Sequence, residues 1–148
     1  MLDEDSKWFA VSLRIMGDAF DPTQVESLLG LKPDILGIRG QPRIGKQGRQ
    51  YAPYETNLWS YQEGSSSGIG FDQRIQSLFA RLGDRVSELR RLSATEGMDV
   101  ELFCGFSSGN GQGGDSFRPE TLKLLVDAGL SLTLDLYPPT IDTDDIAE

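Results

Sequence analysis

The sequence predicts an α+β fold, a two-layer α/β sandwich with helices on one face of a mixed four- to five-stranded sheet, ferredoxin-like in character. Segments with apolar residues at every second position alternate along the chain with segments whose apolar residues follow helical spacing. The strand segments are half polar, which indicates that one face of the sheet is packed and the other is at least partly open. The predicted order is β-α-β-α(α)-β-α-β, with extra helix between two βαβ-like halves.

The first strand is predicted over residues 9–15, where apolar side chains alternate with more polar ones. Asp21 and Pro22 predict a helix start, since aspartate caps helix N-termini and proline fits the first turn. Gly30 predicts the end of this short helix, because glycine adopts the left-handed conformation after a helix at little cost. The alternating apolar residues of the strand are Phe9, Val11, Leu13 and Ile15.

The middle of the chain is rich in glycine and proline. Residues 35–39 have the composition of a short strand, and so do residues 58–61. The repeated glycines and prolines between them predict a long loop, of the kind that is usually functional or mobile. The stretch Gly64-Ser65-Ser66-Ser67-Gly68 predicts a flexible connection.

Helical spacing begins at Phe71 and resumes after an interruption at Gly83-Asp84. This pattern predicts two consecutive helices, or one kinked helix, ending by Gly97. A strand over residues 100–106 follows.

A helix that begins near Pro119 and a strand over residues 130–136 complete the domain. We assign the single α/β domain to residues 8–139. An N-terminal tail of residues 1–7 precedes it, and an acidic C-terminal tail of residues 140–148 follows it.

The charge of the chain limits its partners. The chain has 148 residues and a net charge of −9, which argues against broad contact with a phosphate backbone, so nucleic acid is an unfavoured partner. The start of the chain is acidic, unlike a secretory signal, and no apolar run approaches the roughly 20 residues that span a bilayer. We therefore expect a cytoplasmic protein that has no membrane partner.

The chain contains no histidine and a single cysteine, Cys104. The lack of histidine excludes Ser-His-Asp and Cys-His catalysis. A single cysteine excludes an intrachain disulfide, and the two facts together exclude structural zinc. The tail Asp142-Thr143-Asp144-Asp145 lacks the central glycine and late glutamate of a calcium loop. We assign no cofactor, no metal and no catalytic residue.

The stretch SSGNGQGGDSF, residues 107–117, contains Gly109-x-Gly111-x-x-Gly114, the spacing of a dinucleotide-binding fingerprint. In such a site the third glycine lies in the first helical turn, where the helix N-terminus binds pyrophosphate. Here Pro119 places the helix start beyond the glycines, and Asp115 adds negative charge where phosphate would lie. We interpret the stretch as a mobile loop that can be shortened without unfolding the domain.

A basic segment over residues 39–51 is interleaved with glycine and joined by Tyr51 and Tyr54. Such a segment is the best candidate in the chain for an anion-binding loop. The simpler interpretation is a solvated loop that balances an acidic body. The candidate anion-binding residues are Arg39, Arg43, Lys46 and Arg49.

The open sheet face carries the other candidate site. If Leu13, Leu102 and Leu132 face the helices, their strand neighbours must face away, since successive side chains alternate. Arg14 would then form a cross-strand ion pair with Asp135 or Glu101, and aromatic residues beside it would anchor an interface. The simpler interpretation is an ordinary polar sheet face. The candidate binding residues are Arg14, Trp59, Tyr61, Glu101, Asp135 and Tyr137.

Several short motifs resemble one known family in their order and spacing. They are Gly17-Asp18, Asp21-Pro22, Leu29-Gly30-Leu31-x-Pro33, Arg39-Gly40, Trp59 and Leu134-Asp135-Leu136-Tyr137. Over residues 8–137 the chain is similar to the family called domain of unknown function 4279 (DUF4279). The resemblance implies a small bacterial α/β domain with no established activity, and it carries over no catalytic residues. The glycine-rich stretch at 107–116 departs from the family pattern.

These observations favour a non-enzymatic protein-interaction or binding module. It would use the open sheet face and the loop of residues 37–57 to hold a protein partner, with a basic partner favoured by the charge of the chain. An immunity-type protein, which neutralises a toxin, fits the small size, the acidity and the lack of catalytic groups by analogy. An unpaired edge strand leaves homodimerisation open.

The first alternative is a small anionic-ligand binder or a histidine-free enzyme. Arg14 would clamp an anion, Asp135 or Glu101 would act as acid or base, and Tyr137 would donate a hydrogen bond. This alternative requires a concave pocket that contains both Arg14 and Asp135. A weaker alternative is nucleic-acid binding through the basic loop of residues 39–51.

Overall fold

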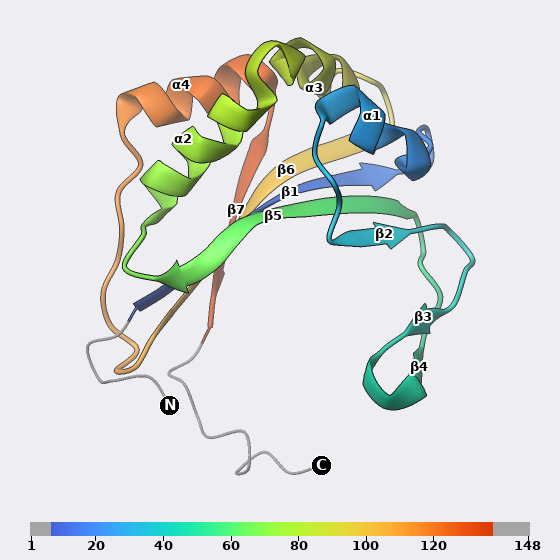
Figure 1. Ribbon diagram of the computed structural model, residues 1–148, viewed down its shortest axis with the longest axis horizontal. Coiled ribbons are helices and arrows are strands. Elements are labelled where there is room, and N and C mark those ends of the chain that lie inside the picture. Colours follow the sequence, from blue (N-terminus) through green and yellow to red (C-terminus); the bar gives the residue numbers. More distant parts are fainter. Residues whose placement is uncertain (1–6, 138–148) are drawn as a thin grey trace.

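A computed structural model describes residues 7–137, apart from the side chains at positions 46 and 65–67. The predicted fold class is confirmed: helices cover one face of a mixed sheet whose strand order is β2-β5-β1-β6-β7 (Figure 1). The predicted tails, residues 1–7 and 140–148, lie outside the described residues except for Lys7, which begins β1.

The first strand of the chain lies in the middle of the sheet. β1 pairs antiparallel with β5 on one side and with β6 on the other, β2 extends the β5 side, and β7 adds parallel to β6. The strands of the sheet are β1 (Lys7–Gly17), β2 (Ile35–Gly37), β5 (Asn57–Ser67), β6 (Met98–Ser108) and β7 (Ser131–Leu136).

The helices form one layer on the sheet (Figure 1). The predicted interruption at Gly83-Asp84 separates α2 from α3, and Pro119 opens α4 as the sequence predicts. The helical segments are η1 (Pro22–Gln24), α1 (Val25–Leu29), α2 (Phe71–Leu82), η3 (Gly83–Arg85), α3 (Val86–Ser93) and α4 (Pro119–Ala128).

The two halves of the domain differ in topology. β6, α4 and β7 form a βαβ unit with parallel strands, as expected. The strands on either side of α1, β1 and β2, are not neighbours: β5 lies between them and is antiparallel to both. β1 and β2 are therefore parallel to each other, so the first half is a βαβ-like unit with β5 inserted between its strands, whereas the strands of the second half are adjacent.

Local sequence accounts for the ends of the first helical segment. The carboxylate of Asp21 accepts hydrogen bonds from the backbone N–H of Thr23 at 2.9 Å and from its hydroxyl at 2.6 Å. These bonds lower the pKa of Asp21, with the side-chain bond contributing most. Gly30 ends α1 with φ of 71°, in the left-handed region that favours glycine.

The core lies between the helices and the side of the sheet that carries the predicted apolar alternation. Leu13 of β1 and Leu102 of β6 are opposite each other and fully buried. Cys104 follows on the same side, and its burial, with a smaller contribution from Asp115, raises the pKa of the thiol to about 12. Cys104 therefore behaves as a small apolar residue.

Two segments contain more regular structure than expected. β5 runs through the stretch expected to be a flexible connection, because β1 supplies an antiparallel partner up to position 67. A shift of register between Ala10 and Ser12, with Gly64 at φ of 77°, accommodates the glycine as a bulge.

The long loop predicted after residue 37 contains a small hairpin. Its strands β3 (Arg43–Ile44) and β4 (Gln50–Tyr51) are joined by η2 (Lys46–Gly48). The hairpin projects from the body on the side of the sheet opposite the helices (Figure 1).

Candidate functional site

The sheet register places most of the candidate residues on the side away from the helices. Arg14 of β1 lies opposite Glu101 of β6, and Asp135 of β7 lies opposite Gly105 of β6. No helix of residues 7–137 covers this side (Figure 1). We define the open face as the residues on this side of β1, β6 and β7 and the residue after β7: Trp8, Ser12, Arg14, Glu101, Phe103, Gly105, Thr133, Asp135 and Tyr137.

Arg14 does not form the ion pair that the sequence predicts. Its guanidinium carbon lies 4.8 Å from the centre of the Phe103 ring, in a cation–π contact. Within the described chain, the ion pairs do not include Arg14 with Glu101 or with Asp135. Arg14 leans over Phe103, so its N–H groups stay available to an acceptor from outside.

Glu101 has an unmet hydrogen-bonding group on the open face. Its Oε2 atom is buried, and no donor among the described residues lies within hydrogen-bonding distance. A buried acceptor without a donor costs free energy of roughly 1–3 kcal/mol, and more when it is charged. Glu101 therefore carries a carboxylate oxygen that the described residues leave without a donor.

An aromatic pair covers one end of the open face. The rings of Trp8 and Tyr137 meet edge to face with centroids 5.9 Å apart. They lie over Gly105, where an added Cβ would be 3.0 Å from Cε2 of Tyr137. A side chain at this position would push the Tyr137 ring away from the sheet.

The charges on the open face act on Tyr137. Burial raises the pKa of Tyr137 most, a hydrogen bond and the charge of Asp135 raise it further, and the charge of Arg14 lowers it. Arg14 and Asp135 therefore lie near enough to Tyr137 for their charges to act on its hydroxyl.

Trp59 and Tyr61, which we placed with these residues, lie on the opposite side of the sheet. They pair with Ile15 and Leu13, whose side chains face the helices. Trp59 is fully buried, and its ring stacks on that of Tyr61 at 6.5 Å. The alternation itself holds the signal that we missed, because two bulky aromatic residues flank the small Ser60.

Tyr61 belongs to a polar cluster between β5 and α2. Its hydroxyl donates to Glu63 Oε1 at 3.1 Å, and Arg81 Nε donates to both carboxylate oxygens of Glu63 at 2.9 Å. Burial and the neighbouring Glu63 raise the pKa of Tyr61, and Glu63 also raises that of Arg81. This cluster satisfies its own hydrogen bonds and is structural.

Arg39, at the start of the basic loop, is held by the body of the fold. Arg39 forms an ion pair with Asp18 at 2.9 Å, and Thr56 donates to the same carboxylate. Two of the motifs that carry the family resemblance, Gly17-Asp18 and Arg39-Gly40, therefore meet where the hairpin leaves the sheet.

The other basic residues of the loop lie further along the hairpin. Arg43 lies over the rings of Tyr51 and Tyr54, at 5.9 Å and 5.5 Å. Arg49 is exposed, and the side chain of Lys46 is outside the described part. Arg39 thus lies at the base of the hairpin, and Arg43 and Arg49 lie along it.

The glycine-rich stretch is anchored at its second half. Asp115 Oδ2 accepts the backbone N–H of Phe71, the first residue of α2, at 2.7 Å, and the rings of Phe117 and Phe71 stack at 5.5 Å. The carboxylate therefore caps α2, whose N-cap residue, Gly70, has no side chain to do so. The expectation of a mobile loop is not supported at these two residues.

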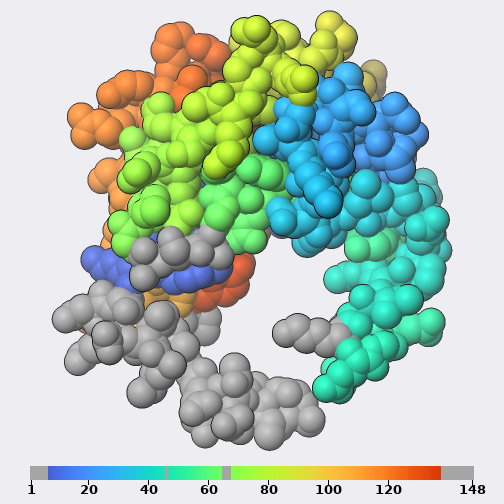
Figure 2. Space-filling model, in the orientation of Figure 1, coloured from blue at the N-terminus to red at the C-terminus, as the bar shows by residue number. Residues whose placement is uncertain are grey.

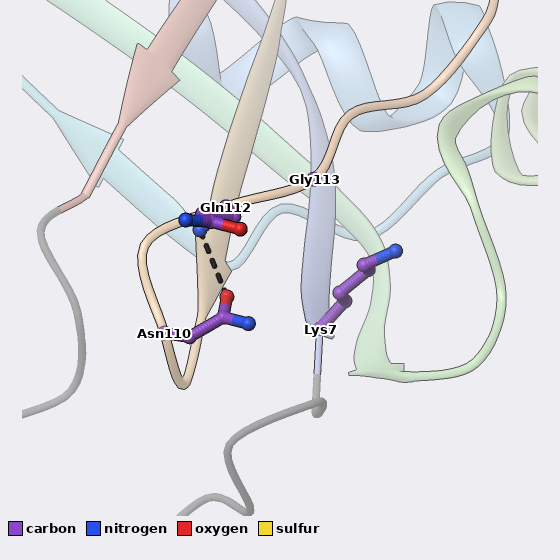
Figure 3. A pocket seen from close by; sticks show the side chains of 4 residues that line it. All are labelled: Lys7, Asn110, Gln112 and Gly113. Atoms are coloured by element: carbon purple, nitrogen blue, oxygen red, sulfur yellow. Dashed lines mark hydrogen bonds between the residues drawn. The ribbon is translucent and has the colours of Figure 1, made fainter.

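The first half of the stretch lines a polar hollow of about 390 Å³ together with Lys7. Asn110 accepts the backbone N–H of Gln112 at 2.9 Å, and the ammonium group of Lys7 points away from both side chains (Figure 3). The glycines lie outside any helical turn, since α4 begins at Pro119. The loop does not form a phosphate cradle.

A second cavity, of about 200 Å³, is apolar and was not anticipated from the sequence. It opens between the start of α2, the end of the glycine-rich stretch and β7. Its apolar lining consists of Phe71, Phe106, Phe117, Leu134 and Leu136. Neither this cavity nor the polar hollow includes Arg14 or Asp135 in its lining.

Residues 7–137 show neither a candidate metal site nor a candidate membrane-spanning helix. In this range, no group of at least three histidine, cysteine, aspartate or glutamate side chains is arranged to hold a metal ion. Over the same residues, no helix combines the length and apolarity needed to cross a membrane.

Comparison with known proteins gives one match. The model of one protein family, described as "Domain of unknown function (DUF4279)", matches residues 6–139. No curated protein and no solved structure matches the chain.

Proposed function

The chain belongs to the DUF4279 family, and from the geometry of its open face we propose that it is a non-enzymatic protein-interaction module that holds a protein partner there. The observation that carries the proposal is the state of two facing side chains, Arg14 and Glu101. They occupy paired positions on β1 and β6, yet Arg14 rests on Phe103 and Glu101 Oε2 has no donor in the described residues. A partner that offers an acceptor to Arg14 and a donor to Glu101 would satisfy both.

The side chains around this pair are those that usually anchor interfaces. Arginine, tryptophan and tyrosine dominate the binding energy of protein interfaces, and Trp8 and Tyr137 lie on the same face as Arg14. Phe103 adds a ring on which Arg14 is already oriented, so little side-chain freedom would be lost on binding.

The β3–β4 hairpin supplies a second contact surface. Figure 2 shows that it stands off from the body and leaves a hollow on its inner side. Ile44 and Tyr51, at 68% and 47% exposed, make its surface partly apolar. A partner seated on the open face would therefore meet the hairpin as well.

The net charge of −9 favours a basic partner, because complementary charge speeds encounter and disfavours acidic competitors. A small acidic chain that blocks a basic toxin, an immunity-type protein, is the class of role that fits best by analogy.

The enzymatic alternative has less support. Its requirement was a concave pocket with Arg14 and Asp135, and neither of the two cavities described above contains them. Nucleic-acid binding through the hairpin also has less support, because Arg39 is already paired with Asp18.

A site-specific crosslinking experiment tests the proposal. A benzophenone amino acid in place of Phe103 should capture a discrete protein in the native host, and Arg14→Ala should abolish the capture. The same crosslinker in place of Leu28, which is 38% exposed on α1 in the helix layer, is the matched control. Equal capture from both positions, or capture that Arg14→Ala leaves unchanged, contradicts a partner on the open face.

A further inference from the structure

The two edges of the sheet are protected to very different degrees. On the β5 edge, β2 covers only the first residues of the strand. Beyond β2, Asp34 Oδ2 accepts the N–H of Gln62 at 2.6 Å, and Arg74 donates to the carbonyl oxygen of Glu63 at 3.2 Å. The bulge at Gly64 follows. Side chains that occupy edge groups, and bulges that twist the edge, are the usual ways to prevent pairing with another chain.

The β7 edge has none of these devices within the described chain. Its sequence, Ser131-Leu132-Thr133-Leu134-Asp135-Leu136, contains no proline, lysine or glycine, and its pairing with β6 shows no shift in register. No strand pairs with its outer side in the described residues. Its leucines are exposed to an extent unusual for a sheet: Leu132 by 36%, Leu134 by 53% and Leu136 by 70%.

The backbone groups of these leucines point outward. Tyr137 donates its N–H to the carbonyl oxygen of Phe106 at 2.9 Å, so the odd-numbered residues of β7 bond to β6. Hydrogen-bonding direction alternates along a strand. The N–H and C=O groups of Leu132, Leu134 and Leu136 therefore face the free edge.

We propose that two copies of this chain pair through β7, antiparallel, about a two-fold axis at Leu134, so that their two five-stranded sheets become one continuous sheet. In this register Leu134 lies opposite Leu134, and Leu132 lies opposite Leu136. Every outward backbone group of the three leucines gains a partner, and the leucines of both copies lie on the same side.

Charge and backbone geometry select this register over its neighbours. A shift to an axis at Asp135 would place that carboxylate opposite its own copy, which is destabilising, whereas the axis at Leu134 places it opposite Thr133. An axis at Thr133 would require the N–H of Leu130, which already donates to Leu125 at 3.0 Å.

The apolar cavity beside β7 supports a second copy of the chain as the partner of this edge. Leu134 and Leu136 contribute to its lining, and the register places Leu132 of the second copy beside Leu136, at the edge of the cavity. A two-fold interface must be self-complementary, and the alternating leucines of β7 meet this condition. Asp135 is the sole ionisable residue of β7. The strand therefore contributes little to the electrostatic repulsion between the two negatively charged chains.

The test uses charge at the axis. Sedimentation of the wild-type chain should give twice the 16.3 kDa mass of one copy. Leu134→Lys and Leu134→Glu should each be monomeric, because like charges would face each other, and an equimolar mixture of the two should return to twice the monomer mass. Ile44→Lys, an exposed apolar residue of the hairpin, is the matched control and should remain dimeric.

Each alternative outcome overturns the proposal. If sedimentation shows the wild-type chain to be monomeric at every concentration measured, the β7 edge pairs with a strand of another protein or remains unpaired. A dimer that survives Leu134→Lys uses another surface. A mixture of the two charged variants that stays monomeric rejects the axis at Leu134. Circular dichroism of each variant distinguishes loss of pairing from loss of fold.

Discussion

Two glutamates on opposite sides of the sheet differ in how their charge is satisfied. Glu63, 8% exposed, receives hydrogen bonds from Tyr61 and Arg81. Glu101 has an oxygen with no donor among the described residues, beside an arginine that rests on a ring. Buried polar groups are normally satisfied, and an exception calls for an explanation. The contrast separates a carboxylate that stabilises the fold from one that lacks a donor among the described residues, which is the basis of the partner site proposed above.

Replacing the tyrosine of the Glu63 cluster should change how stability depends on pH. Burial and Glu63 raise the pKa of Tyr61 above its ordinary value of 10.0. The unfolded chain therefore loses this proton first as pH rises, so the contribution of Tyr61 to stability is complete below about pH 10 and is lost above it. Urea unfolding of wild type and Tyr61→Phe across this range should show the wild-type advantage shrinking as pH rises. Parallel curves would rule out the raised pKa.

At the residue scale, the sequence predicts faces better than contacts. Strict alternation placed Arg14, Glu101 and Asp135 together, because period two allows no other arrangement within a strand. It did not predict that Arg14 would lie over Phe103, since the orientation of a long side chain depends on neighbours from two strands. Trp59 was assigned to the wrong face, although the small Ser60 between the bulky Trp59 and Tyr61 indicates which side of β5 is packed.

At the scale of elements, α2 and α4 cap each other through the glycine-rich stretch. Asp115, which precedes α4, accepts the N–H of Phe71 at the start of α2. In return, Asp72 in the first turn of α2 accepts the N–H of Arg118, the N-cap residue of α4, at 2.8 Å. In the sequence, Asp115 argued against a phosphate site. In the structure, its carboxylate is itself the anion at the N-terminus of α2.

Length and anchoring in this stretch should have separable effects on stability. Inserting Gly-Ser-Gly-Ser after Gly111 should lower the free energy of unfolding by only a few tenths of a kcal/mol, because loop closure depends weakly on length. Asp115→Ala should lower the free energy of unfolding by about 1 kcal/mol through loss of the cap. Asp115→Asn should keep most of this stability, because the amide oxygen can still accept the N–H of Phe71. Chemical denaturation measures all three. An insertion that costs more than Asp115→Ala would show that the whole stretch is rigid.

The elements that the sequence did not predict depend on partners distant in the chain. β5 continues through Gly64 and residues 65–67, whose composition favours a loop, because β1 holds this segment in a ladder. The β3–β4 hairpin lies where repeated glycines interrupt the alternation of apolar and polar residues that would predict strands. The Asp18–Arg39 ion pair fixes the base of this hairpin. By contrast, the residue patterns of β1, α2 and α4 predict these elements locally, although the cap of α2 comes from the distant Asp115.

At the scale of the whole molecule, charge and the β7 edge act in opposite directions. Each copy carries a net charge of −9, so two copies repel each other, while the leucine contacts proposed at the edge are insensitive to salt. Raising ionic strength screens the repulsion. We expect the dimer to dissociate less at high salt than at low salt, as measured by sedimentation over a dilution series. A dimer weakened by salt would indicate an interface held by ion pairs instead.

The place of β1 in the sheet also has a consequence for how the chain folds. Among the strands of this sheet, the one synthesised first is the central one, and Lys7 at its start pairs with Ser108 at the end of β6. Contacts between residues so far apart in sequence form slowly, because a long loop must close before they contribute. On the ribosome, β1 must therefore wait until β6 has emerged. The sheet is completed late, and the unpaired flanks of β1 are the part of the nascent chain most in need of protection.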